Sequence, residues 1–148
     1  MWGMQITVCA THIYVASASI TYNATANTHT TSKSVWQLPV STLEEVLTNE
    51  GRSPLQWTET SPTPLYRSSL LQHTAHPLAI GGQDDSYKPS PNIAVYDPRS
   101  NKWSTVGQLL EPRVWCTVVS LSRLSFLVCG GCSDPRNPQS TQIGRAHV

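Results

Sequence analysis

The sequence has few charged residues. Asp, Glu, Lys and Arg make up 13% of its 148 residues, and the formal net charge is +1. A surface that binds nucleic acid or an anionic membrane needs clustered positive charge, so the composition argues against both partners. No apolar run approaches the roughly 20 residues of a membrane-spanning helix. The first 15 residues lack a basic segment, and His12 interrupts their apolar part, so they do not resemble a signal peptide.

Cysteine is also scarce. The four residues Cys9, Cys116, Cys129 and Cys132 are too few for a disulfide scaffold in a chain of this length. This favours a reduced, cytoplasmic protein. One glycosylation triplet, Asn23-Ala-Thr25, keeps a secreted protein open as the alternative.

Turn-forming residues are plentiful, whereas long helical patterns are few. Eleven prolines and eight glycines, with many Ser and Thr, indicate short strands joined by frequent turns. The length is sufficient for one domain with a hydrophobic core. The composition therefore predicts an all-β domain.

Two segments, HPLAIGGQDD and LSFLVCGGCSD, share an apolar run, a glycine pair and a polar stretch containing Asp. The pairs Gly81-Gly82 and Gly130-Gly131 are 49 residues apart. Trp57 and Trp103 are 46 apart, as are Arg67 and Arg113. Three landmarks at nearly one spacing indicate a structural repeat.

The best-preserved unit predicts four strands, at residues 66–72, 77–81, 93–96 and 102–106. QHTAHP makes the first hairpin turn, and DPRSN supplies turn residues before the last strand. A polar loop, GQDDSYKPSPN, joins the second strand to the third. Apolar residues occur on both faces of these strands, as expected for a small sheet packed between two others.

The unit resembles the kelch repeat, in which an apolar strand ends in Gly-Gly and is followed by a Tyr and then a Trp. Gly81, Gly82, Tyr96 and Trp103 match these marks, and Arg113 opens the next strand. The resemblance implies a partial kelch-type β-propeller, an open arc of about one complete and two incomplete four-stranded blades. Trp57, Gly130 and Gly131 are the corresponding repeat marks in the flanking blades.

We place a degenerate blade at residues 5–65, a complete blade at 66–112, a truncated blade at 113–134 and a loop at 135–142. In the degenerate blade, Ala16-Ser17 stand where glycines would be, and Trp36 stands at the Tyr position. About 14 extra residues follow. Within them, Ser41 and Glu44 have the spacing of a capping box, which predicts a short helix near 41–50. The helix is either a partner-docking element or a neutral loop insertion.

The last six residues, IGRAHV, match one reading frame of a widely used sequencing adapter, with its stop codon directly after Val148. We interpret residues 143–148 as an adapter-derived tail and leave them out of the fold. The chain is then a fragment of a longer reading frame, and further blades of that frame become partners of its bare edges.

The resemblance also implies a function, which is non-catalytic binding of a protein partner on the loop face of the propeller. The residues placed on that face are Tyr66, Arg67, Asp84, Asp85, Tyr87, Lys88, Glu111 and Arg113. In some kelch proteins, arginines at the Arg67 and Arg113 positions hold acidic side chains of a peptide. The alternative is that these arginines bond only backbone carbonyls near the channel. Many kelch proteins carry a BTB domain and act as ubiquitin ligase adaptors, so that role is implied as well.

Other chemistry has weaker support in the sequence. Cys129 and Cys132 form a C-x-x-C pattern, but only the glycines between them recur in the repeat. His73 and His76 lie at a hairpin tip without further metal ligands nearby, and Asp84-Asp85 lack a partner acid or base. We therefore predict no catalytic residues, cofactor or metal. The alternative function is a kelch-fold enzyme such as a copper radical oxidase or a sugar-acid isomerase.

Overall fold

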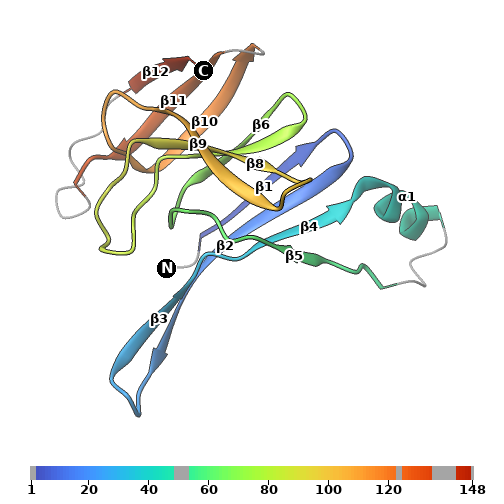
Figure 1. Ribbon diagram of the computed structural model, residues 1–148, viewed down its shortest axis with the longest axis horizontal. Helices are drawn as coiled ribbons and strands as arrows, with labels where there is room; N and C mark the ends of the chain where they lie inside the picture. Colours follow the sequence, from blue (N-terminus) through green and yellow to red (C-terminus); the bar gives the residue numbers. More distant parts are fainter. Residues whose placement is uncertain (1–2, 49–53, 123–124, 135–142, 148) are drawn as a thin grey trace.

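The computed structural model describes residues 3–48, 54–122, 125–134 and 143–147. Within these ranges the chain forms three antiparallel sheets and one helix (Figure 1). We name the sheets I, II and III in chain order. The described residues include no helix of the length and hydropathy that a membrane span requires.

Sheet II is the complete unit predicted from the repeat. Its strands pair in sequence order and are β6 (Ser69–His73), β7 (His76–Ile80), β8 (Asn92–Asp97) and β9 (Lys102–Gln108). All four overlap the predicted strands. The β8–β9 turn uses the expected chemistry, because the Asp97 carboxylate accepts a bond from the Arg99 backbone N–H at 3.0 Å. Asn101 takes a positive φ of 51° in the same turn.

Sheet I has the same strand order with different connections. Its strands are β1 (Gly3–Cys9), β2 (His12–Asn23), β4 (Val35–Pro39) and β5 (Thr58–Thr60), while β3 (Thr28–Ser32) pairs with the far half of β2. The β2–β3 hairpin extends away from the three sheets (Figure 1). Sheet III contains β10 (Val114–Ser122), β11 (Ser125–Cys132) and β12 (Ile143–His147).

The sheets pack face to face in the order I, II, III. Tyr14 and Val35 of sheet I form a buried cluster with Tyr96 of sheet II. Ile80 of sheet II packs in a second cluster with Phe126 of sheet III. Strand β6 contacts both β1 and β10, so the first strands of the three sheets adjoin. The fold is an all-β, partial kelch-type β-propeller, an open arc of blades.

Gly81 and Gly82 end strand β7 with φ angles of +62° and +112°. This left-handed region is readily available only to glycine. In sheet I, the strand pairing places Ser17 and Ala18 at the matching positions. There the chain stays extended, and β2 continues into the long hairpin.

The same register corrects two alignments made from the sequence. The glycine positions of sheet I fall on Ser17 and Ala18 rather than on Ala16 and Ser17. Leu38, not Trp36, occupies the position of Tyr96; Trp36 matches Ala94. Trp36 was aligned with Tyr96 because both side chains are aromatic, whereas strand pairing sets the true register.

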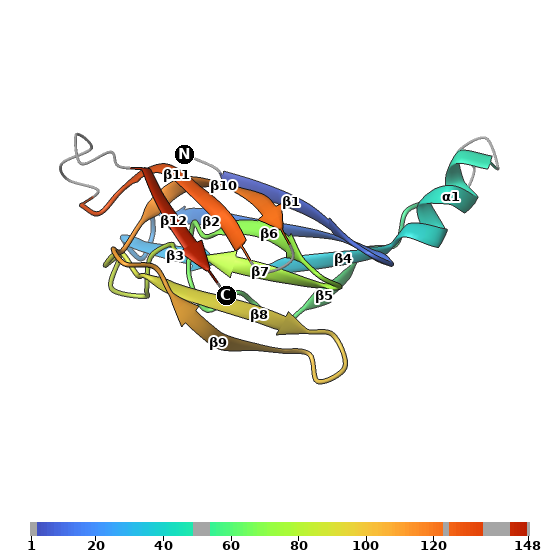
Figure 2. The ribbon, with the colours of Figure 1, turned by 90° about the horizontal axis from the view of Figure 1, so that it is seen from above.

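Helix α1 (Val40–Thr48) lies in the segment where the capping box predicts a helix. It follows β4 directly and projects beyond the ends of the strands (Figure 2). None of its residues is buried, and Leu47 is 73% exposed. The helix therefore adds little to the core.

The C-terminal tail, which we left out of the predicted fold, forms a strand of sheet III. Ile143–His147 forms β12 and pairs antiparallel with β11 from Ser125 to Cys129. The pairing uses the backbone and is compatible with many sequences, so it does not test the proposed adapter origin. The loop predicted at 135–142 lies outside the described residues.

Candidate interaction face

The long connections of sheet II meet at the end of the sheet opposite its tight hairpins. The β7–β8 loop is joined to the segment before β6 by reciprocal backbone bonds between Tyr66 and Gln83, at 2.8 and 2.7 Å. Gln83 is 3% exposed, and its side-chain amide donates to the backbone carbonyl of Tyr87 at 3.0 Å. This residue holds the two segments and the tip of the loop together.

The β7–β8 loop is shaped by its own side chains. The Asp84 carboxylate accepts backbone N–H bonds from Ser86 and Lys88, both at 2.9 Å. Asp84 therefore acts as a turn former. Tyr87 has a positive φ of 60° and stacks on Tyr66, with ring centroids 6.3 Å apart and 15° between the planes.

Asp85 joins this loop to sheet I. Its carboxylate pairs with the Lys33 ammonium at 2.7 Å, and the hydrogen bond and charge of Lys33 lower the pKa of Asp85. Lys33 also lies 4.6 Å from the centre of the Tyr66 ring. Lys33 was not selected from the sequence, because its pairing with Asp85 depends on the packing of sheet I against sheet II.

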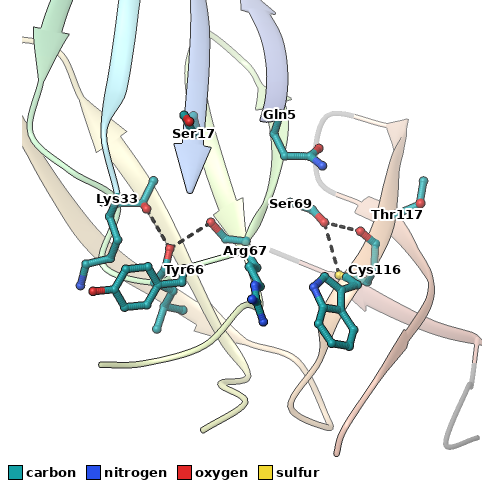
Figure 3. Close-up of a pocket in the computed structure, with 13 residues that line it drawn as sticks. Gln5, Ser17, Lys33, Tyr66, Arg67, Ser69, Cys116 and Thr117 are labelled. Carbon is teal, nitrogen blue, oxygen red and sulfur yellow. Dashed lines mark hydrogen bonds between the residues drawn. The ribbon is translucent and has the colours of Figure 1, made fainter. Parts of the chain in front are cut away.

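A pocket of about 250 Å³ opens beside these residues, at the junction of the three sheets (Figure 3). Sheet I contributes Gln5, Ala16 and Ser17. Figure 3 shows Arg67 between Tyr66 on one side and Ser69 and Cys116 on the other. Lys33 and Arg67 are the charged residues of the described lining, which otherwise consists of Gln5, Ala16, Ser17, Thr63, Leu65, Tyr66, Ser68, Ser69, Trp115, Cys116 and Thr117.

The positively charged guanidinium of Arg67 contacts two uncharged side chains. It donates to the Gln83 side-chain oxygen at 2.9 Å and lies 5.4 Å from the Trp115 ring centre. Lys33, in contrast, already has a carboxylate partner. The pocket therefore presents a positive charge that no described carboxylate neutralises directly.

Strand pairing corrects the proposed equivalence of Arg67 and Arg113. The register of β6 and β7, continued through the Tyr66–Gln83 bridge, sets Arg67 opposite Gly82. In sheet III, Trp115 lies opposite Gly131. Arg67 and Trp115 thus hold equivalent positions, with φ angles of 55° and 57°. The two arginines have the same spacing as the two tryptophans. The number of residues between equivalent positions varies along the chain, however, so this spacing does not make the arginines equivalent.

Arg113 takes a structural role in this arrangement. It is 5% exposed, and its guanidinium donates to the backbone carbonyl of Gly130 at 3.0 Å. Its backbone carbonyl accepts a bond from the Gly82 N–H at 2.7 Å. Glu111 lies 3.5 Å from the guanidinium. These contacts match the alternative in which the arginine bonds backbone carbonyls.

Three residues of this face have a positive φ although they do not lie in hairpin turns. Among the described non-glycine residues with positive φ, four lie in strand-connecting hairpin turns: Ala10, Asn27, Thr74 and Asn101. The other three, Arg67, Tyr87 and Trp115, lie around the pocket and the neighbouring loop. Strained residues with large side chains persist only where the surrounding structure enforces them, and they are frequent at binding sites.

The structure brings together Arg67, Tyr87 and Lys88, which line one depression next to the pocket together with Asp134. Asp84 and Asp85 make bonds within the face, and Arg113 is buried beneath it. Trp115, which is 48% exposed, was not selected from the sequence. Its position opposite a Gly-Gly pair could have identified it.

The residues considered for other chemistry are separated or buried. Burial is the main cause that raises the pKa of the Cys132 thiol, and it also raises the pKa of the Cys116 thiol. No group of three or more His, Cys, Asp or Glu residues in the described part of the chain is arranged to hold a metal ion. The side chain of His73 lies outside the described part.

Comparison with known proteins agrees with the repeat analysis. A family model of the kelch motif matches residues 78–110. Kelch-like protein 21 of Bos taurus is 36% identical in an alignment of 75 residues that covers 40% of this chain and 13% of that protein. Kelch-like protein 21 of Homo sapiens is 42% identical over 43 residues, which is 29% of this chain and 7% of that protein.

The chain therefore spans only about an eighth or less of these curated relatives. The solved structure of YjhT superposes with a TM-score of 0.65 at 13% identity, covering 89% of this chain and 45% of the YjhT chain. That likeness concerns the fold alone. Together the matches support a kelch-repeat family and a propeller architecture.

Proposed function

We propose that the chain is a protein-interaction scaffold whose loop face binds a segment of a partner protein. The observation that carries this proposal is a set of three strained residues on one face: Trp115 lines the pocket, Tyr87 lines the neighbouring depression, and Arg67 lines both. Their planar side chains supply large contact areas with few rotatable bonds, which suits recognition. The similarity to Kelch-like protein 21 supports the same class of function.

The partner segment carries an acidic side chain in this proposal. Arg67 faces the pocket with neutral partners, and a guanidinium binds a carboxylate through two parallel hydrogen bonds. Tyr87, Lys88 and Trp115 form the surrounding contact surface. Asp84, Asp85, Glu111 and Arg113 belong to the same face and hold its loops in place.

The scaffold is non-catalytic in this proposal, and in a longer protein it would recognise substrates for a ubiquitin ligase. Further blades of that longer chain would then cover its bare sheets. The four cysteines are free, which is consistent with a reducing cytoplasm. Co-purification of a cullin with the longer protein, but not with a version lacking its remaining domains, would support the adaptor role.

Binding to an array of peptides with varied charge tests the proposal. Wild type is expected to select acidic peptides, and Arg67→Ala should weaken binding at least tenfold. Arg99→Ala removes an exposed arginine from the opposite end of sheet II and should bind like wild type. Selection of neutral or basic peptides would contradict the acidic partner, and equal loss in both variants would contradict the assigned face.

A further inference from the structure

The Gln83 side chain joins the pocket to the loop beside it. Its amide oxygen accepts a hydrogen bond from Nη1 of Arg67 at 2.9 Å, and its amide nitrogen donates to the backbone carbonyl of Tyr87 at 3.0 Å. Arg67 offers only donors and the carbonyl only an acceptor, so these two partners fix the orientation of the amide. Gln83 is 3% exposed and lines the depression.

The neutrality of this amide affects the charge of the pocket. A glutamate at the same position would form an ion pair with Arg67 and neutralise the guanidinium within the protein. Gln83 instead holds the guanidinium through Nη1 without cancelling its charge, and a guanidinium has further N–H donors on Nη2 and Nε. Gln83 therefore orients Arg67 while leaving its charge and further donors for a ligand.

The other charges around the pocket and the depression largely balance. The charged side chains in the described lining of these two cavities are those of Lys33, Arg67, Lys88 and Asp134. Asp85 adds a second carboxylate through its ion pair with Lys33. Three positive and two negative charges leave one positive charge for a ligand.

We propose that Gln83 is a positioning residue that selects the charge of the ligand, and that the ligand group is one carboxylate, as in Asp or Glu, rather than a phosphate. This inference rests on the proposed function and narrows its acidic segment to one kind of anion. A phosphorylated side chain carries close to two negative charges. One of them would stay without a compensating charge in the pocket, and burial of such a charge is unfavourable.

Small anions test this site without knowledge of the partner protein. Propionate has the carboxylate of a Glu side chain, and propionamide is its neutral counterpart. The indole N–H signal of Trp115 in an NMR spectrum, assigned with Trp115→Phe, reports binding because the ring centre lies 5.4 Å from the Arg67 guanidinium. In the 148-residue chain, propionate should shift this signal and propionamide should not. No shift with propionate, or equal shifts with both compounds, would overturn the proposal.

Two substitutions of Gln83 separate its effect on charge from its effect on the loop. Gln83→Glu and Gln83→Met both lose the donor to the Tyr87 carbonyl, but only Gln83→Glu adds a carboxylate beside Arg67. Gln83→Glu should bind propionate roughly tenfold more weakly than Gln83→Met, since its ion pair neutralises the guanidinium. Equal losses in both variants would show that Gln83 only holds the loop, and a wild-type response of Gln83→Glu would show that it does not control the charge.

Asp85→Asn tests the charge balance at an exposed position, where misfolding is not expected. The Asp85 side chain is 77% exposed, and the substitution leaves the charge of Lys33 without its carboxylate. Inorganic phosphate, mainly a dianion at pH 8, should bind the wild type more weakly than propionate does. It should bind Asp85→Asn about threefold more tightly than the wild type, in line with the small worth of an exposed ion pair.

The two proposals fail in different ways. Tighter binding of phosphate than of propionate by the wild type, or no gain in phosphate binding by Asp85→Asn, would overturn the choice of a carboxylate. A propionate response that Gln83→Glu removes, in a chain that selects no acidic peptide from the array, would support the carboxylate site and refute the protein partner.

Discussion

At the scale of single residues, the glycine pairs determine how closely the strands approach one another. A Cβ added to Gly81 would lie 2.5 Å from the Arg113 carbonyl oxygen, and one added to Gly131 would lie 2.5 Å from that of Val114. Gly130 has a positive φ of 67°, but a Cβ there would have no neighbour within 4 Å. In sheet III, substitution of Gly130 would therefore introduce backbone strain alone, whereas substitution of Gly131 would introduce both backbone strain and a steric clash.

Gly130→Ala and Gly131→Ala should destabilise the fold to different extents. The left-handed conformation alone costs a residue with a Cβ about 1 to 2 kcal/mol, and this is the loss expected for Gly130→Ala. Gly131→Ala should cost more, because the Val114 backbone must also move. Urea denaturation of the two variants measures the difference, and equal losses would show that the close approach is unimportant.

Two buried ionisable groups predict the response to alkaline pH. Burial raises the pKa of Cys9 to about 11 and that of Tyr14 to about 12, from ordinary values of 9.0 and 10.0. Because the folded-state pKa is the higher one, the stabilising contribution is present below pH 9 for the thiol and below pH 10 for the phenol. Each contribution is lost as the pH rises toward the folded value.

Stability should therefore fall between about pH 9 and pH 12. Tyr14→Phe should reduce the part of this fall that lies above pH 10, since the variant has no phenol to ionise. Urea midpoints at pH 8 and pH 11.5 measure the effect. The exposed Tyr87→Phe serves as control and should retain the wild-type pH dependence.

At the scale of elements, α1 and β4 are adjacent in sequence but contribute differently to stability. Leu38 of β4 is 1% exposed, whereas Leu47 of α1 is 73% exposed. Leu38→Ala should cost about 2 to 5 kcal/mol through lost burial and a cavity. Leu47→Ala should change stability by less than about 0.5 kcal/mol.

Thermal or chemical denaturation of the two leucine variants gives this comparison. A small effect at Leu47 fits a loop insertion that the fold tolerates, although it leaves a docking role for α1 open to binding measurements. A large effect at Leu47 would mean that the helix is covered in solution by something beyond the described contacts.

Element boundaries were predicted well where the repeat marks are complete. The strands of sheet II follow from alternating apolar runs and from turn residues such as Asp97 and Asn101, which act within a few positions of the chain. In sheet I, Trp36 misled the alignment, because local sequence does not report which residue of a neighbouring strand it faces. The candidate site was predicted less completely, since Lys33 and Trp115 reach it from sheets I and III.

At the scale of the whole molecule, the origin of the tail is the decisive question. If IGRAHV derives from an adapter, the natural transcript should continue past Gln142 with a different sequence. Sequencing the transcript and the genomic locus tests this. The same codons in genomic DNA would show that β12 belongs to the natural protein and that the adapter interpretation is wrong.

The all-β class, the glycine pairs Gly81-Gly82 and Gly130-Gly131 and the resemblance to a kelch-type arc could be predicted from the amino-acid sequence. These features depend on short-range chemistry: glycines that allow positive φ, turn residues, and apolar alternation. Contacts between residues of different sheets could be read only from the folded chain. Buried Arg113 bonds the backbone of the neighbouring strand, and Arg67 lies in a pocket with Gln83 and Trp115 as neutral partners, because these contacts depend on the packing of strands that are distant in the chain.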